Sequence, residues 1–111
     1  MLAGILFLIN PICEITMNKV TIKYCTGCRW LIRSTWMAQE LLTTFESDID
    51  ELTLVPGVDG IFQVQVNEQL VWDRKTEGGF PQITELKQRV RDIIVPERSL
   101  GHVDKVQNSN I

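Results

Sequence analysis

Cys25 and Cys28 are separated by two residues and lie between a segment with strand character and a segment with helix character. Two cysteines at this spacing in the first turn of a helix hold their sulfurs close enough to form a disulfide. The same turn presents unpaired backbone N–H groups and the positive end of the helix dipole, which both favour the thiolate. Because the thiolate is the attacking species, we expect thiol–disulfide exchange, with Cys25 as the more exposed attacking sulfur and Cys28 as the resolving one.

Several residues near the cysteines in sequence are expected to shape this site. Lys23 and Arg29 add positive charge, and Gly27 has no side chain that would keep another backbone away from the sulfurs. Trp30 follows Cys28 by two residues and is expected to border the site. A second interpretation is a protein-binding module whose partner contact is switched by oxidation of the cysteines. Its docking surface would consist of Thr26, Gly27, Gly78, Gly79 and Phe80.

A metal site and two buried, inert cysteines are the alternatives to redox chemistry. A C-x-x-C pair can supply half of a zinc site, but the other half would have to come from Cys13 and His102, near the two ends of the chain. No second C-x-x-C or H-x-x-x-H is present. The position of the pair between a strand and a helix favours the redox interpretation. We therefore expect a thiol–disulfide oxidoreductase without a metal or a cofactor.

Hydrophobic periodicity predicts the elements that position the cysteines. Apolar and polar residues alternate in four segments, as in half-buried strands, and recur at near 3.6 spacing in two others, as in amphipathic helices. The predicted strands are Val20–Tyr24, Glu51–Val55, Ile61–Val66 and Gln69–Asp73; the predicted helices are Trp30–Phe45 and Pro81 to Pro96, with a polar loop over Arg74–Phe80. A strand–helix–strand opening implies a right-handed parallel crossover. The order therefore predicts an α/β fold, a mixed four-stranded sheet with two main helices.

Length and composition are those of one small globular domain. The chain has 111 residues, of which 44% are hydrophobic and 23% charged, which excludes a disordered or collagen-like chain. A net charge of -3 argues against nucleic-acid binding, which needs clustered cationic charge. Three cysteines are too few for a disulfide scaffold.

The two ends of the chain are expected to lie outside the folded domain. Residues 1–9 are uniformly apolar but much too few to span a bilayer, so we expect no membrane partner. We interpret residues 1–16 as an upstream extension of the reading frame that is not native, with a weak export signal and an extra strand as rival interpretations. Residues 17–96 form the predicted domain. Residues 97–111 are polar and are expected to be a flexible tail.

Four segments of this chain resemble the selenoprotein W-related family, also called the Rdx family. They are Val20–Trp30 (VTIKYCTGCRW), Gly60–Asp73 (GIFQVQVNEQLVWD), Gly78–Pro81 (GGFP) and Glu85–Arg91 (ELKQRVR). The segment Pro96–Asp104 resembles bacterial members. The resemblance implies a thioredoxin-like fold over residues 17–96 and a redox-active Cys25–Cys28 disulfide. It also implies that the partner is a low-molecular-weight thiol such as glutathione, or a client protein. We expect the protein to be cytoplasmic.

The resemblance also bears on the roles of the two cysteines. Selenocysteine-containing family members carry selenocysteine at the position of Cys28, so this chain resembles a cysteine homologue in which Cys28 is the reactive centre. Thioredoxins favour Cys25 instead, and the order of attack stays open. No proline immediately precedes the strand that begins at Ile61, where thioredoxins carry a cis-proline beside the sulfurs. A general disulfide reductase role is therefore not expected.

Overall fold

A computed structural model of the chain describes residues 17–101. The interpretations of residues 1–16, and of Cys13 and His102 as metal ligands, lie outside the described residues. The elements are β1 (Lys19–Cys25), α2 (Leu31–Thr44), β2 (Glu51–Gly57), β3 (Phe62–Val66), β4 (Gln69–Asp73), α3 (Arg74–Glu77) and α4 (Ile83–Ile94). The predicted strands and main helices are all present, with ends that differ by one or two residues.

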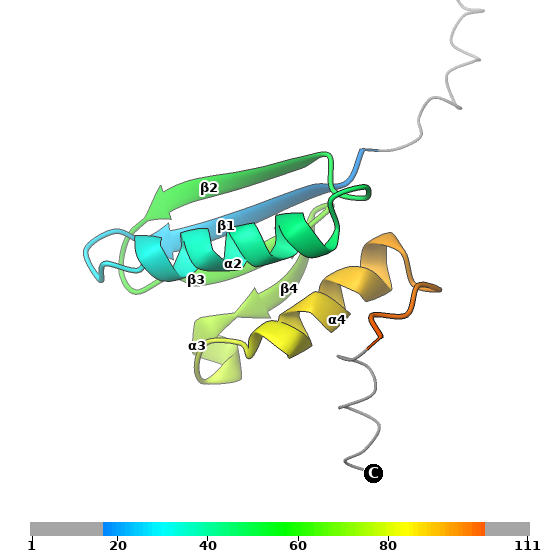
Figure 1. Ribbon diagram of the computed structural model, residues 1–111. Helices are drawn as coiled ribbons and strands as arrows, with labels where there is room; N and C mark the ends of the chain where they lie inside the picture. The colour runs from blue at the N-terminus through cyan, green and yellow to red at the C-terminus, as the bar shows by residue number, and fades with distance from the viewer. Residues whose placement is uncertain (1–16, 102–111) are drawn as a thin grey trace, which may run out of the picture.

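The four strands form one mixed sheet in the order β2-β1-β3-β4. β1 and β2 are parallel and are joined by α2, whereas β1 pairs antiparallel with β3, and β3 with β4. Both main helices lie on the same face of the sheet, α2 over β1 and α4 beside β4 (Figure 1). The α/β prediction, with a mixed four-stranded sheet, is thus confirmed.

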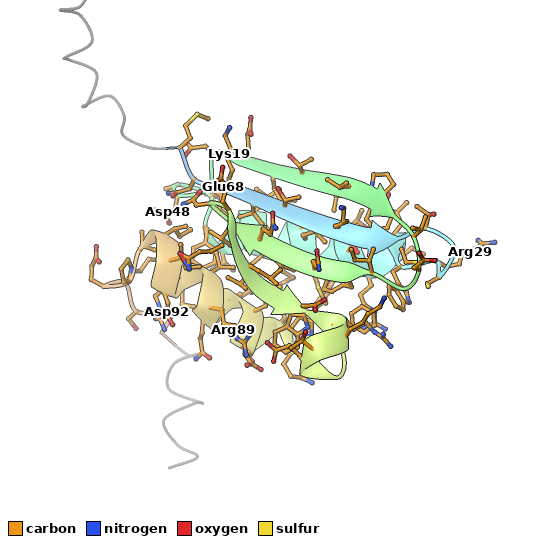
Figure 2. All side chains as sticks on the ribbon, turned by 180° about the vertical axis from the view of Figure 1, so that it is seen from behind. Lys19, Arg29, Asp48, Glu68, Arg89 and Asp92 are labelled. Carbon is orange, nitrogen blue, oxygen red and sulfur yellow. The ribbon has the colours of Figure 1, made fainter. Side chains whose placement is uncertain are left out.

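The core lies between the sheet and the two helices because one set of alternating strand residues faces inward. Val20, Ile22 and Tyr24 of β1 are buried, and so are alternate residues of β3. The helices cover them with buried side chains at helical spacing: Met37, Ala38 and Leu41 of α2, and Leu86 and Val90 of α4. Full burial of one such aliphatic side chain contributes about 1.5–3 kcal/mol. The opposite face of the sheet carries polar side chains and is not covered by a helix (Figure 2).

The β3–β4 hairpin has the predicted two-residue loop. Asn67 and Glu68 have φ of 49° and 72°, the positive values that a tight turn between twisted strands requires. Asn67 also ties the loop to β1, because its Oδ1 accepts a hydrogen bond from the Lys19 amide at 2.8 Å. The hairpin register brings Trp72 of β4 opposite Val64 of β3.

The segment after β4 differs from the predicted polar loop. Its first four residues form the short helix α3, which ends at Gly78 with φ of 83°. The Thr76 hydroxyl donates to Asp73 Oδ2 at 2.7 Å and stabilises the first turn. A loop prediction over all of Arg74–Phe80 was therefore wrong, because a single helical turn is too short to show hydrophobic periodicity.

The described residues beyond α4 return to the end of α2. Arg98 forms an ion pair with Asp48 and donates to the Thr44 carbonyl at 2.9 Å. In the part of the chain that the structure covers, none of the helices has the length and apolar character needed to cross a membrane.

Candidate redox site

The cysteines lie at the edge of the sheet where β1 and β2 both end. Because these strands are parallel, their carboxyl ends meet, and Cys25 is paired with Gly57. The Thr26 amide donates to the Gly57 carbonyl at 3.1 Å and fixes the point where the chain leaves the sheet. A side chain at residue 57 would place its Cβ 2.7 Å from Ile61 Cγ2, so only glycine fits there without a shift.

The chain between β1 and α2 is a tight turn rather than the start of the helix. The Arg29 amide donates to the Thr26 carbonyl at 3.0 Å, and the Trp30 amide reaches the Cys25 carbonyl at 3.4 Å. Arg29 has φ of 63°, which costs a non-glycine residue about 1–2 kcal/mol. The helix begins only at Leu31, so the prediction that both cysteines lie in its first turn was wrong. The turn closes on its own hydrogen bonds before helical geometry begins.

The two sulfurs face each other as free thiols. The Cys28 thiol donates to Cys25 Sγ, and the two Sγ atoms are 2.8 Å apart. Cys25 is only 3% exposed, whereas Cys28 is exposed. The prediction that Cys25 is the more accessible sulfur was therefore wrong. Cys25 ends a central strand and is covered by the neighbouring turns, while Cys28 projects from the loop.

The surroundings separate the pKa values of the two thiols. The pKa of Cys25 lies below its ordinary value because its thiolate accepts hydrogen bonds from the Cys28 thiol and from the backbone N–H groups of Gly60, Cys28 and Gly27. The pKa of Cys28 is raised chiefly because its thiol donates a hydrogen bond to Cys25, and further by partial desolvation and by the negative charge of Cys25. Arg74 opposes this increase through its positive charge. The hydrogen bond between the two sulfurs therefore lowers the pKa of Cys25 and raises the pKa of Cys28.

An aromatic cluster packs beside the loop. The Trp30 and Phe80 rings meet edge to face with centroids 4.9 Å apart, and Phe80 also meets Phe62 at 5.0 Å. Phe62 is fully buried, whereas Trp30 and Phe80 are half-buried. The cluster therefore packs the start of α2, through Trp30, and the loop after α3, through Phe80, against the same part of the core.

Two arginines cover this cluster from different elements. The Arg33 guanidinium, from α2, lies 4.2 Å from the centre of the Phe80 ring. The Arg74 guanidinium, from α3, lies 4.7 Å from the centre of Trp30 and 5.2 Å from that of Phe80. Arg74 Nε is buried and has no hydrogen-bond partner. The site thus has positive charge from two side chains that are 41 residues apart in sequence.

The other predicted contact residues have mixed positions. Thr26 and Gly27 are exposed in the cysteine loop, and a Cβ added at Gly27 would meet no atom within 4 Å. Gly78 ends α3, and the Gly79 carbonyl accepts a hydrogen bond from Trp72 Nε1 at 2.9 Å. The structure therefore brings Phe80 to Trp30, while Gly78 and Gly79 shape the loop that holds it. Phe80 is packed against its neighbours rather than presented at a loop tip.

Two shallow hollows adjoin the cysteine loop on the α2 side. One has a volume of about 480 Å³ and is lined by Arg29, Trp30, Ile32, Arg33 and Trp36. The other, of about 320 Å³, is lined by Tyr24, Thr26, Arg29, Leu31 and Ile32. A larger hollow of about 640 Å³ lies around Met17 and Lys19, at the opposite end of β1 from the cysteines. Figure 2 shows this separation through the labelled Lys19 and Arg29.

Sequence reasoning missed four residues of this site. Gly57 and Gly60 contact the cysteine loop through their backbone groups, and Arg33 and Arg74 contribute charge. The cluster of proline and glycine at the end of β2 was a usable signal, because parallel neighbours end at one edge. No local pattern distinguishes Arg33 or Arg74 from other surface arginines. Among residues 17–101, no three His, Cys, Asp or Glu side chains are placed to hold a metal ion.

Comparisons with known proteins agree with this architecture. A profile of the Rdx family matches residues 19–92. A crystal structure of a Bordetella parapertussis protein is 52% identical, has a TM-score of 0.68, and aligns with 69% of this chain and 98% of its own. A selenoprotein W-related protein from Vibrio cholerae is 45% identical, has a TM-score of 0.69, and aligns with 70% of this chain and 98% of its own. No curated protein matches significantly. The chain belongs to the Rdx family, with its thioredoxin-like fold.

Proposed function

We propose that this protein transfers electrons between thiols and disulfides through Cys25 and Cys28. The observation that carries the proposal is the pair of free Sγ atoms 2.8 Å apart, one of them on an exposed residue. A sulfur pair this close needs only a small displacement to reach the length of a disulfide, about 2.05 Å. Membership of the Rdx family supports the same chemistry.

The accessible sulfur meets the substrate first. The step starts with Cys25 as a thiolate and Cys28 as a thiol. Cys28 Sγ attacks one sulfur of a substrate disulfide, while the Cys28 proton passes to Cys25 Sγ. The substrate S–S bond breaks, a mixed disulfide forms on Cys28, and the first substrate thiolate leaves and takes the proton from Cys25. Cys25 Sγ then attacks Cys28 Sγ, which forms the Cys25–Cys28 disulfide and releases the second substrate thiolate. Two electrons have moved from the protein to the substrate.

This assignment uses both differences between the cysteines. Cys28 is exposed and therefore accessible to a substrate, whereas Cys25 is buried. The lowered pKa of Cys25 suits it to attack as a thiolate in the resolving step. Transfer of the Cys28 proton to Cys25 is uphill, because Cys28 has the raised pKa, and is completed only as Cys28 attacks the substrate. The proposal thus gives Cys28 the contact with substrate and Cys25 the resolving step.

The partner in this proposal is a low-molecular-weight thiol such as glutathione, or a client protein. Either one supplies the thiol or disulfide that the exchange consumes, and no cofactor takes part. We place the reaction in the cytoplasm, where a dithiol persists because the compartment is reducing. The reduction potential of the cysteine pair against the glutathione couple decides in which direction electrons flow.

Single cysteine variants test the proposal. The reduced protein is mixed with a small disulfide, and intact mass is followed over time; Cys13→Ser is introduced into the wild type and both variants so that only Cys25 and Cys28 can react. We expect the wild type to lose two hydrogens, Cys25→Ser to accumulate a stable mixed disulfide on Cys28, and Cys28→Ser to react much more slowly. If the wild type stays reduced, or if Cys28→Ser forms the adduct as fast as Cys25→Ser does, the proposed chemistry or its order is wrong.

Exposed apolar side chains favour a second candidate function, a protein-binding module with a redox switch. Ile32 is 81% exposed, and Trp36 and Leu31 are 47% and 46% exposed, all on the part of α2 next to the cysteine loop. A partner that covers them would sense the oxidation state of the cysteines. The test is to measure the affinity of the reduced and of the oxidised protein for the same partner. A difference between the two affinities supports this candidate, and equal affinities rule out the redox switch.

A further inference from the structure

Arg33 and Arg74 form no ion pair with any carboxylate among residues 17–101. The carboxylates nearest to Arg74 in sequence are engaged elsewhere. Asp73 accepts hydrogen bonds from Thr76 and Gln63, and Glu77 pairs with Arg89 at 2.8 Å. Both guanidinium groups therefore rest on aromatic rings with their positive charge uncompensated inside the described domain.

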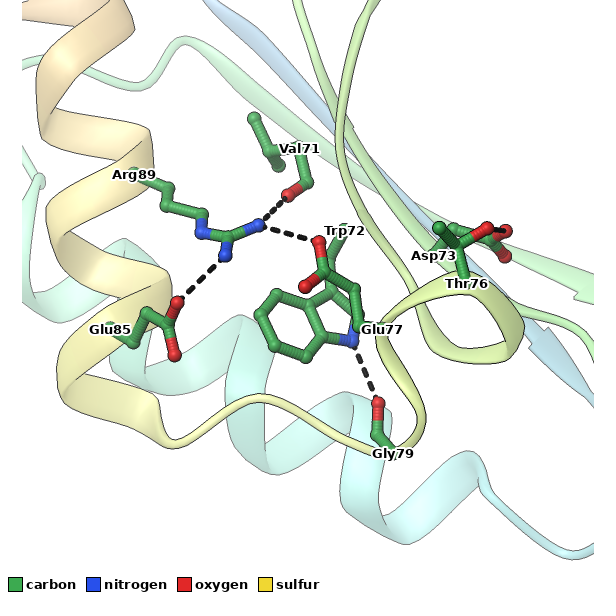
Figure 3. A network of polar contacts seen from close by, with 8 residues as sticks. All are labelled: Val71, Trp72, Asp73, Thr76, Glu77, Gly79, Glu85 and Arg89. Atoms are coloured by element: carbon green, nitrogen blue, oxygen red, sulfur yellow. Dashed lines mark hydrogen bonds and ion pairs between the residues drawn. The ribbon is translucent and has the colours of Figure 1, made fainter.

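The same protein contains the completed form of this arrangement around Arg89 (Figure 3). The Arg89 guanidinium lies 4.6 Å from the centre of the Trp72 ring. It donates to Glu77 at 2.8 Å, to Glu85 at 2.7 Å and to the Val71 carbonyl at 2.8 Å. There an arginine stacked on tryptophan also binds two carboxylates. At Trp30 the arginine and the ring are present, and the carboxylates are missing.

We propose that Arg33 and Arg74, held on Trp30 and Phe80, form a carboxylate-binding subsite beside the cysteine pair. The inference rests on the proposed thiol–disulfide exchange and deepens it by naming the substrate class. The preferred substrate is a disulfide or thiol with a carboxylate close to its sulfur. A planar guanidinium with free N–H groups binds carboxylates by charge-assisted hydrogen bonds, which are stronger than those between neutral groups.

The position of the subsite fits a substrate whose sulfur is at Cys28. Trp30 is two residues from Cys28, and Arg74 is close enough for its positive charge to oppose the rise in the pKa of Cys28. Arg33 and Trp30 line the hollow of about 480 Å³ together with Arg29, Ile32 and Trp36. A substrate there would have cationic groups for its carboxylate and apolar side chains for its carbon atoms.

The net charge of the protein makes the inference testable, because it predicts a preference for cationic substrates, whereas the subsite predicts a preference for anionic ones. The chain has a net charge of -3, so its average field favours cationic substrates over anionic ones. A preference for anionic disulfides therefore requires local positive charge at the reacting sulfur. This preference should weaken as salt is added, because the Debye length falls to about 10 Å at 0.1 M ionic strength.

The test compares the rates at which the full-length reduced protein reacts with matched disulfides. Dithiodiglycolate is anionic, hydroxyethyl disulfide neutral and cystamine cationic, and each rate is divided by that of the same disulfide with mercaptoethanol. We expect the normalised rate for the anion to exceed that for the cation by about tenfold or more at low salt. Arg33→Gln and Arg74→Gln should each reduce this ratio severalfold. A second arm uses disulfide-linked peptides with glutamate or lysine beside the cysteine.

Lys19→Gln is the control, because it removes the same charge from the other end of β1, about 20 Å from the cysteines at 3.3 Å per strand residue. It should leave the ratio unchanged. Selectivity in both arms means that a small carboxylate is sufficient, and selectivity in the peptide arm alone means that the subsite takes an acidic peptide segment.

This experiment distinguishes failure of the proposed subsite from failure of the proposed function. If every disulfide oxidises the protein and no arm shows a preference for carboxylates, or if neither arginine variant alters the preference, the subsite is refuted while the exchange reaction stands. If no disulfide oxidises the protein, the proposed function itself fails. Arg33 is exposed, so Arg33→Gln keeps the test valid even if Arg74→Gln destabilises the fold.

Discussion

Replacing Phe80 with leucine isolates the contribution of its ring to the site. Leucine retains most of the apolar contact but removes two edge-to-face contacts, with Trp30 and Phe62, and the ring beneath Arg33 and Arg74. An aromatic pair contributes about 0.5–1.5 kcal/mol, and a cation on a ring about 0.5–1 kcal/mol when exposed. Because contacts that share one ring are not additive, we expect Phe80→Leu to lower the free energy of unfolding by about 2–3 kcal/mol.

Urea unfolding followed by circular dichroism measures this loss. The melting temperature should fall by about 10–20 °C, since 1 kcal/mol corresponds to about 4–8 °C in a domain of this size. A double-mutant cycle with Arg74→Gln then separates the cation–ring contact from the rest. The expected coupling between residues 74 and 80 is about 0.5–1 kcal/mol.

If the free energy of unfolding of Phe80→Leu is within 0.5 kcal/mol of the wild type, about the usual effect of a neutral surface substitution, the ring contacts do not stabilise the fold as expected. If the variant is destabilised as expected but shows no coupling to Arg74, the guanidinium contributes nothing through the ring. Phe80→Leu should also slow disulfide formation, since Trp30 would lose the support that holds the chain next to Cys28.

Three further substitutions test the core, the sheet edge and an acid-sensitive contact. Leu41→Ala should lower the free energy of unfolding, measured by urea denaturation, by about 2–5 kcal/mol, because the Leu41 side chain is fully buried and its removal leaves a cavity. Gly57→Ala should cost about 1–3 kcal/mol and slow oxidation of the cysteines, because the new Cβ would lie 2.7 Å from Ile61 Cγ2; unchanged stability would show that this contact relaxes freely. The Thr76 hydroxyl is the main cause that lowers the pKa of Asp73, so Thr76→Val should raise that pKa toward 3.8. Because a lowered carboxyl pKa stabilises the fold above the ordinary value, urea titrations should show this variant less stable than wild type above about pH 4, with a deficit that shrinks as both proteins become protonated at lower pH. If the variant is still less stable than wild type by the same amount at pH 2, the loss comes from the missing hydroxyl and not from the charge of Asp73.

Much of the fold could be predicted from local patterns. Alternation in β1 and β3 and the 3.6-residue spacing in α2 and α4 repeat over several residues, and each repeat adds to the same signal. The parallel crossover followed from the order of the elements. The helix α3 escaped prediction because it is one turn long, and the start of α2 was misplaced because hydrogen bonds in the cysteine turn precede it.

The cysteine pair and its family were identifiable from the chain because the C-x-x-C and the other matching segments are local patterns, and because a tight turn between a strand and a helix brings the two sulfurs together. Local sequence patterns alone were therefore enough to predict the cysteine pair as the candidate site, the order of strands and helices, and the relationship to the Rdx family. Which sulfur is accessible depends on long-range packing, and it could not be read from local patterns. Cys25 is paired with Gly57 at the end of β2 and receives a backbone hydrogen bond from Gly60, both more than 30 residues away in sequence.

The charged surroundings of the sulfurs were likewise a matter of tertiary structure alone. Arg33 and Arg74 meet over Phe80 because α2 and α3 pack against the same aromatic cluster. Such contacts join residues far apart along the chain, and they form only where strand register and helix packing place the side chains together. Short-range periodicity carries no information about them, because it records which face of an element is apolar and not what that face will touch.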